Sequence, residues 1–271
     1  MAKPVDASAL EGFTVSPFSA HGETHDVYRM GSGPAVIVIH EVPGLTPLVA
    51  AFARKVAARG LTVVLPSLFG TPGEPMSVSY ALKSVAHACV SREFSTWATG
   101  RTSPITRYLR ALALHEHEAC GGPGVGAVGM CLTGGFALAM SVDDVMLAPI
   151  LSQPGLPLPV GAKRKNDLGI SSSDLAIIKR RANEGLCVMG MRFTGDKGSP
   201  AEKFVHLRAE LGENFIGVEI DSSPGNPWGY RKAAHSVLTE DYSDKEGSPT
   251  REALEDVLNF FTTRLTVTGA N

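Results

Sequence analysis

Short apolar runs alternate with longer amphipathic stretches along most of the chain. The nearly continuous apolar runs predict strands that are buried on both faces of a sheet. The predicted strands are Thr24–Met30, Ala35–His40, Leu61–Pro66, Val125–Gly129, Val145–Leu151, Leu186–Phe193 and Ile216–Ile220. Apolar residues at helical spacing predict helices at Leu48–Arg59, Ile105–Ala119, Phe136–Met140, Ser173–Asn183, Pro200–Leu211 and Thr250–Leu265. This alternation predicts an α/β fold with a mostly parallel central sheet and helices on both faces.

The chain is expected to form one domain. Strand and helix signals continue to its end without a linker rich in Pro, Gly or Ser, and 44% of the 271 residues are hydrophobic, which is ample for a core. Residues 1–23 are interpreted as an N-terminal extension and residues 266–271 as a tail.

Charge and composition narrow the class of function. Lys and Arg number 25 against 27 Asp and Glu, a net charge of −2, and without a long basic cluster we expect no nucleic-acid partner. We see no apolar run of the ~20 residues that a membrane span needs. Residues 1–12 lack a signal-peptide pattern. The oligomeric state is left open.

The cysteines and histidines do not suggest a metal site. The four cysteines are scattered without metal-ligand spacing, which suits reduced thiols in a cytoplasmic protein: Cys89, Cys120, Cys131 and Cys187. His115 and His117 are two positions apart on a predicted helix, so their rings diverge. We interpret this pair as part of a solvated helix end, and no metal or cofactor is expected.

The most informative motif surrounds Cys131. The apolar run Val125–Met130 leads to this thiol, and Gly134, Gly135 and an apolar helical run follow. This order predicts a strand, a sharp turn with a nucleophile at its apex, and a helix, which is the nucleophile elbow of α/β-hydrolases written with Cys. The strained turn requires small neighbours, and the helix start directs backbone N–H groups at a reacting carbonyl. The alternative is a buried structural cysteine at a strand–helix junction.

The elbow resembles that of the dienelactone hydrolase family, whose nucleophile is a cysteine in a Gly-x-Cys-x-Gly-Gly setting. Thr133 stands where that family usually has the first glycine after the nucleophile, so we expect a slightly repacked turn. The resemblance spans roughly residues 35–265 and implies an α/β-hydrolase fold.

A thiol nucleophile needs a base and an acid, which follow it in that fold in the order acid, then histidine. Only His206 and His235 follow Cys131, and His235 is preferred because it lies in an irregular stretch before the last helix. Asp196, in the turn after Leu186–Phe193, is the preferred acid, with Asp221 as the alternative. A solely structural role for His235 and an N-capping role for Asp196 remain open.

The oxyanion hole needs two backbone donors. We expect the N–H of Leu132 and that of Val42, in the loop after Ala35–His40. The resemblance further implies that Glu41 bonds the resting Cys131 thiol and takes part in activating it.

The substrate is less defined than the reaction. Enzymes that act on dienelactone hold its carboxylate with arginines, and no arginine stands just after His235. Arg92 and Arg101 are candidates for the other arginine, and we expect Arg92 and Trp228 to contact the substrate. The Pro/Gly-rich loops 70–75 and 154–169 are expected to cover the site.

The resulting hypothesis is a hydrolase of a small ester, lactone or thioester, acting through an acyl-thioester on Cys131. An acyltransferase or thioesterase on the same site is equally compatible, because the acyl-enzyme is shared. A protein of this fold without catalysis, which binds a small molecule or senses oxidants through Cys131, is the alternative from another class.

Overall fold

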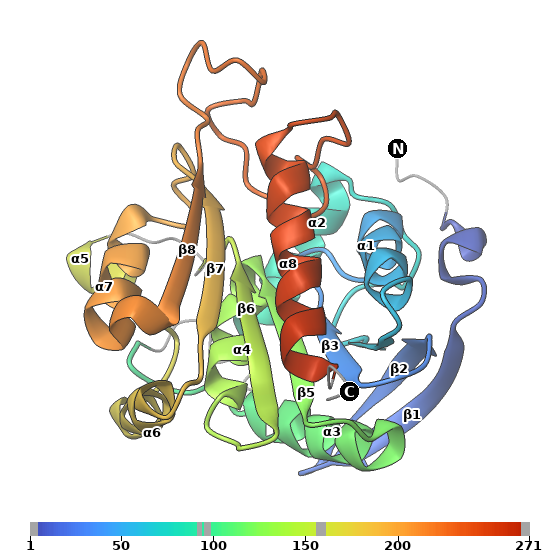
Figure 1. Cartoon of the computed structure of the whole chain (residues 1–271). Coiled ribbons are helices and arrows are strands. Elements are labelled where there is room, and N and C mark those ends of the chain that lie inside the picture. Colours follow the sequence, from blue (N-terminus) through green and yellow to red (C-terminus); the bar gives the residue numbers. More distant parts are fainter. Residues whose placement is uncertain (1–4, 91–93, 95–98, 156–160, 267–271) are drawn as a thin grey trace.

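The computed structural model describes residues 5–90, 94, 99–155 and 161–266, and its centre is one eight-stranded sheet (Figure 1). The strand order is β1-β2-β4-β3-β5-β6-β7-β8, with antiparallel pairing of β1 with β2 and of β2 with β4 and parallel pairing elsewhere. The strands are β1 Thr14–Ala20, β2 Glu23–Met30, β3 Ala35–Ile39, β4 Thr62–Pro66, β5 Val125–Met130, β6 Met146–Ser152, β7 Val188–Phe193 and β8 Phe215–Ile220. The predicted fold class is confirmed.

Helices cover both faces of the sheet. The α-helices are α1 Pro47–Ala57, α2 Val78–Val90, α3 Ile105–Cys120, α4 Gly134–Met140, α5 Ala162–Asn166, α6 Ser172–Asn183, α7 Ala201–Leu211 and α8 Pro249–Leu265. The described residues also form three short 3₁₀ turns, η1 Ala7–Leu10, η2 Cys131–Thr133 and η3 Gly212–Asn214. All the predicted helices are found, with ends that move by one or two residues, whereas α2 and α5 were not predicted.

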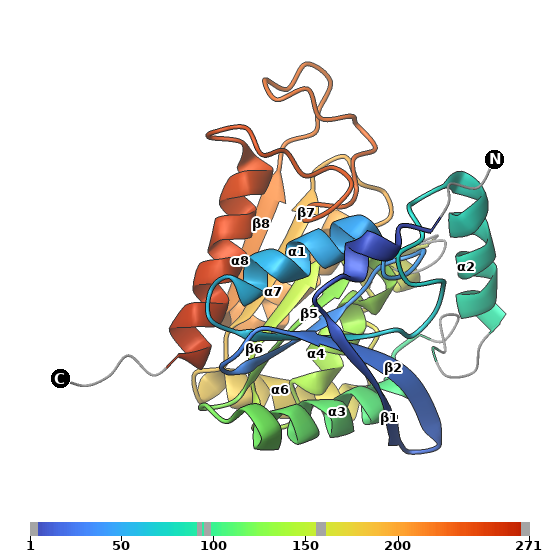
Figure 2. The ribbon, with the colours of Figure 1, turned by 90° about the vertical axis from the view of Figure 1, so that its right-hand side faces the viewer.

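Alternate residues of the central strands pack on opposite faces, as the pleat requires. Val36 and Val38 of β3 pack with α1 and α8, whereas Ile37 and Ile39 pack with α3 and α4. A third apolar cluster joins α4, α6 and α7 beside β7 and β8. Figure 2 shows α1 and α8 on one side of the sheet and α3 and α6 on the other. The central strands are therefore buried on both faces.

The N-terminal residues contribute to the sheet. The expected extension contains β1, whose residues pair with β2 from Thr14 opposite Arg29 to Ala20 opposite Glu23. Most of β1 is exposed, so it lacks the apolar run by which the other strands are recognised. The assignment of the whole chain to one domain stays a prediction.

The helix end around His115 is less solvated than expected. Glu116 is 2% exposed, and its Oε1 lies 2.6 Å from Nη2 of Arg29 on β2. Within the helix end that we interpreted as solvated, Glu116 is therefore buried, and its ion pair joins α3 to the antiparallel edge of the sheet.

Candidate active site

The turn after β5 places Cys131 at the carboxyl edge of the sheet. Cys131 has φ of 54°, a left-handed backbone conformation that non-glycine residues rarely adopt. A Cβ added to Gly129 would lie 2.2 Å from the carbonyl oxygen of Thr133, so the chain can fold back only over a glycine. The predicted elbow is therefore present, with a half-buried free thiol at its apex.

Thr133 holds this turn against β3. Its buried hydroxyl accepts a hydrogen bond from the Met130 N–H at 2.8 Å and lies 2.9 Å from the carbonyl oxygens of Ile39 and Met130. A glycine at this position offers no such link. The side chain at which the sequence departs from the family pattern thus fastens the elbow to the neighbouring strand.

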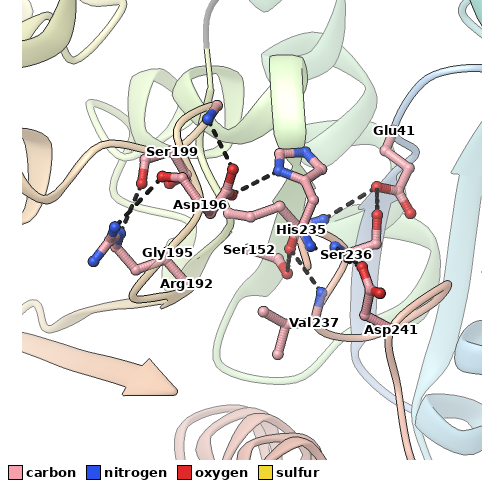
Figure 3. A network of polar contacts seen from close by, with 12 residues as sticks. Glu41, Ser152, Arg192, Gly195, Asp196, Ser199, His235, Ser236, Val237 and Asp241 are labelled. Atoms are coloured by element: carbon pink, nitrogen blue, oxygen red, sulfur yellow. Dashed lines mark hydrogen bonds and ion pairs between the residues drawn. The ribbon is translucent and has the colours of Figure 1, made fainter. Parts of the chain in front are cut away.

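His235 and Asp196 meet across two loops (Figure 3). Asp196 lies in the turn after β7, and its Oδ2 is 2.7 Å from Nδ1 of His235. The other carboxylate oxygen, Oδ1, accepts the N–H of Gly198 at 2.8 Å. Held by both bonds, Asp196 fixes the orientation of the imidazole.

His235 also interacts with Cys131, and its pKa reflects this. Burial lowers the pKa of His235, but the charge of Cys131 and hydrogen bonds to Asp196 and Cys131 raise it well above its usual 6.5. The imidazolium form is therefore favoured when Cys131 is a thiolate. The structure brings together the three residues that were predicted from the sequence.

His206 and Asp221, the alternative candidates for the histidine and the acid, form other contacts. The Nδ1 of His206 on α7 is 2.6 Å from the carbonyl oxygen of Asn166. Asp221 is exposed, and its Oδ1 accepts the N–H of Ser223 at 2.8 Å.

Arg192 shapes the turn that carries Asp196. This arginine is 2% exposed on β7, and its Nε and Nη2 donate to the carbonyl oxygens of Ser199 at 2.7 Å and Thr194 at 3.0 Å. Its Nη1 lies 2.7 Å from Oε2 of Glu219 on β8. The sequence analysis missed Arg192, and a charged residue inside an otherwise apolar strand was the available signal.

The loop that carries His235 is held by side chains. Residues 221–248 contain no helix or strand. Oδ2 of Asp241 accepts the backbone N–H groups of His235 at 2.7 Å and Ser236 at 3.2 Å. This carboxylate therefore fixes the backbone on which the base is mounted.

The Glu41 carboxylate is engaged away from the thiol. Its Oε2 accepts the Ser236 hydroxyl at 2.7 Å and the Gln153 side-chain amide at 3.1 Å, and its Oε1 accepts the Thr239 hydroxyl. These bonds form a network that ties the end of β3 to the His235 loop, and the expected bond from Glu41 to Cys131 stays a prediction. Gln153 extends this network, because its Oε1 accepts the N–H of Val237 at 3.3 Å.

The expected oxyanion donors lie at the ends of β3 and β5. Leu132 is the first residue after the thiol, in η2, and Val42 is two residues after His40. Within the described part of the chain, neither N–H donates to another backbone carbonyl outside regular structure or to a side chain. Their use as an oxyanion hole stays a prediction.

The expected substrate contacts are less informative. Trp228 lies in the loop after β8, 37% exposed, with its ring 3.6 Å from the place of a Cβ on Gly247. Arg92 lies outside the described residues, as does part of the expected cover 154–169, and Arg101 is exposed.

Two negative findings, on metal ligands and on membrane-spanning helices, apply only to the described residues. No group of three or more metal-ligating side chains occurs among them. Within the same ranges, no helix combines the length and apolarity that a bilayer crossing requires.

Several solved structures share this fold. A dienelactone hydrolase described as putative, from Klebsiella pneumoniae, is 16% identical, with a TM-score of 0.59 over 92% of this chain and 98% of its own. A dienelactone hydrolase from Anabaena variabilis is 13% identical, with a TM-score of 0.60 over 94% and 98%. A dienelactone hydrolase-like promiscuous phosphotriesterase from metagenomic libraries is 14% identical, with a TM-score of 0.63 over 94% and 98%.

These likenesses to solved structures establish the fold, and no curated protein matches the chain in sequence. The family model of the dienelactone hydrolases, in contrast, matches residues 26–265. This range includes Glu41, Cys131, Asp196 and His235, most of β2 and all of β3–β8. The chain therefore belongs to the dienelactone hydrolase family.

Proposed function

We propose that the protein hydrolyses a small ester, lactone or thioester, with Cys131 as nucleophile, His235 as general acid and base, and Asp196 as the group that orients His235. The observation that carries this proposal is the positive φ of Cys131 beside an imidazole bound by Asp196 at 2.7 Å. This geometry unites a half-buried nucleophile, a base and an orienting acid.

In the acylation step, Cys131 Sγ forms a bond to the acyl carbon. The N–H groups of Leu132 and Val42 stabilise the oxyanion. When the intermediate collapses, the bond to the alcohol or thiol breaks, and the leaving group takes the proton from the His235 imidazolium. In a lactone the leaving oxygen stays attached to the acyl chain.

In the deacylation step, His235 accepts a proton from water while the water oxygen attacks the thioester carbon. The C–S bond then breaks, and Cys131 leaves as thiolate beside the renewed imidazolium. The product is a carboxylic acid, and no external reductant, oxidant or cofactor enters the balance.

The protein is proposed to act on a free small molecule in the cytoplasm. The reduced state expected of scattered free thiols supports this location.

The test is the reaction with p-nitrophenyl acetate, followed by nitrophenolate release and by intact mass. We expect a burst and an acetyl adduct in the native chain, both lost in Cys131→Ala. In His235→Ala the adduct should form and decay more slowly. Cys187→Ala is the matched control, because it removes another half-buried free thiol and should keep the burst.

Equal slow rates in the native chain and in Cys131→Ala, without an adduct, would contradict the proposal. That outcome would favour a small-molecule-binding or redox-sensing role for Cys131.

A further inference from the structure

Gln153 is a buried polar residue at the end of the strand next to the nucleophile strand. It directly follows β6 and is 0% exposed, and its φ is 35°. Ser152, the last residue of β6, pairs with Met130, the last residue of β5, so Gln153 and Cys131 occupy equivalent positions on neighbouring strands. Both have the left-handed backbone that residues with a side chain rarely adopt, and such strain persists only where the surrounding contacts hold it. The bonds of Gln153 should therefore show what this conformation serves.

The backbone after Gln153 is attached to the nucleophile turn. The N–H of Gly155 donates to the carbonyl oxygen of Cys131 at 2.9 Å. A Cβ on Gly134, the first residue of α4, would lie 2.7 Å from Cβ and 2.8 Å from Cα of Pro154. This segment thus contacts the nucleophile turn at the thiol residue and at the helix that follows it, so Gln153 has a fixed place relative to Cys131.

The side chain of Gln153 reaches the loop that carries His235. Its Oε1 accepts the N–H of Val237 at 3.3 Å, and its Nε2 donates to Oε2 of Glu41 at 3.1 Å. The same oxygen of Glu41 accepts the Ser236 hydroxyl at 2.7 Å (Figure 3). Because Val237 presents a donor and Glu41 an acceptor, the two ends of the carboxamide cannot be exchanged. Gln153 therefore binds the two residues that follow His235, one directly and one through Glu41.

The other bonds of His235 have different effects. Asp241 accepts the His235 N–H at 2.7 Å but belongs to the same loop, so this bond shapes the loop without attaching it to the sheet. Asp196 binds Nδ1 of His235 at 2.7 Å and fixes the rotation of the ring. Gln153, in contrast, bonds both to the loop and, through its own segment, to the turn of Cys131. It is therefore placed to set the distance between the base and the nucleophile.

We propose that Gln153 is a positioning residue that holds His235 beside Cys131. This inference rests on the proposed function and deepens it. In deacylation, the His235 imidazole accepts a proton from water while the water oxygen attacks the thioester carbon. A small displacement of the ring lengthens this contact, so loss of the Gln153 bonds slows the steps that need His235 and leaves the other steps unchanged.

The first test is a double-mutant cycle with p-nitrophenyl acetate in the full chain, with kcat as the measure of deacylation after the burst. Gln153→Met keeps the length of the side chain and removes the bonds to Val237 and Glu41. It should lower kcat by about tenfold or more in the native background, and by less than about twofold in His235→Gln, in which no imidazole remains to be positioned. The Cys131→Ala rate is subtracted as the blank, and circular dichroism gives the folded fraction.

Two further variants complete this test. Gln153→Asn retains the carboxamide on a shorter side chain and should keep part of the activity. Asn214→Leu is the matched control, because it removes a half-buried carboxamide just before β8, at the opposite end of the sheet, and it should change kcat equally in both backgrounds.

If Gln153→Met does not fold, Gln153→Asn takes its place in the cycle, with a smaller expected loss that again falls away in His235→Gln. A folded Gln153 variant with an equal effect in the two backgrounds would overturn the proposal, because the residue would then serve the fold alone.

The second test follows the acetyl adduct on Cys131 by intact mass. The adduct should persist longer in Gln153→Met than in the native chain, because water depends on His235 for activation. Hydroxylamine attacks the thioester carbon through its nitrogen without such help, forms acetohydroxamic acid and returns the Cys131 thiol. It should remove the adduct at similar rates from both proteins. Loss of the adduct in water at the native rate would also overturn the proposal.

The two proposals can fail separately. A native burst that is lost in Cys131→Ala, combined with equal effects of Gln153→Met in both backgrounds, would reject the role of Gln153 alone. A native rate retained in Cys131→Ala would reject the proposed nucleophile, and the role of Gln153 with it.

Discussion

Two histidines at the carboxyl edge of the sheet have pKa values that move in opposite directions. Burial lowers the pKa of His40, at the end of β3, from 6.5 to about 4. His235, in the loop after β8, has a raised pKa although burial opposes its charge, because Cys131 and Asp196 favour the imidazolium. The difference teaches that the charge partners, more than the depth of burial, decide whether an imidazole here carries a proton.

The hydrogen bonds of the two rings show the same contrast. Nε2 of His40 accepts the Leu68 N–H at 3.1 Å, so Nδ1 carries the proton and donates to the Glu41 carbonyl oxygen at 3.0 Å. His40 thus forms bonds that suit a neutral ring that links β3 to the loop after β4. Nδ1 of His235 is bonded to a carboxylate, which suits a ring that gains and loses a proton during the reaction.

The largest expected effect comes from replacing each histidine with glutamine. His235→Gln should lower kcat/KM for the aryl ester by about 10³-fold, because it removes the proton carrier. His40→Gln should lower it by less than about tenfold, because an amide also offers one donor and one acceptor. Steady-state kinetics, with the folded fraction measured by circular dichroism, checks both variants. Equal losses of kcat/KM in the two variants would show that the difference between the two histidines does not matter for catalysis.

The second prediction concerns the pH dependence of stability. The folded pKa of His40, about 4, lies below the usual 6.5, so its contribution is complete above pH 6.5 and is lost as the pH falls to 4. Integrated over that window, the loss is about 3 kcal/mol. His235 contributes in the opposite sense, and its stabilisation, complete below pH 6.5, is lost as the pH rises through its raised pKa.

Urea unfolding at several pH values, compared between the native chain and His40→Gln, isolates the His40 contribution. The free energy of unfolding of the variant should decline less between pH 6.5 and 4. If the two chains decline in parallel, the neutral state of His40 does not contribute to acid sensitivity.

The third prediction addresses the link between the elbow and β3. Thr133→Val keeps the shape of the side chain but leaves the Met130 N–H and the Ile39 carbonyl without their hydroxyl partner. We expect a loss of about 1–3 kcal/mol in the free energy of unfolding. Thr133→Ser retains the hydroxyl and should lose less. A stable Thr133→Val protein would show that these backbone groups find other partners.

The smallest expected effect concerns the backbone under His235. Asp241→Asn weakens the charge-assisted bonds to the N–H groups of His235 and Ser236, which should cost about 1 kcal/mol locally. We expect the variant to lose activity at a lower temperature than the native chain, with little change in the unfolding temperature. Residual activity and circular dichroism, recorded on the same heated samples, check this. Parallel curves in the variant and the native chain would contradict it.

The fold was predictable because the central strands are long apolar runs, and the family resemblance was predictable from the Cys131 elbow. The edge strand β1 and the helices α2 and α5 were missed, and α5 lies in the stretch 154–169 that was expected to be a loop. The exposed β1 lacks an apolar run, and α2 begins within a stretch that was not interpreted as helical.

Parts of the site were less predictable because they depend on contacts between distant residues. The Glu41 carboxylate contacts Ser236 and Thr239, which follow it by 195 and 198 positions. Such pairs leave no local pattern in the sequence.

The irregular structure of the loop that carries His235 affects how the protein loses activity on warming. Because residues 221–248 contain no helix or strand, the base depends on a few side-chain bonds, whereas Cys131 is held by the sheet. The loop rises above the sheet between β8 and α8 (Figure 1). Local opening of such a segment needs less free energy than global unfolding. Warming should therefore produce an inactive state with an intact core, in which the nucleophile remains in place without its proton carrier.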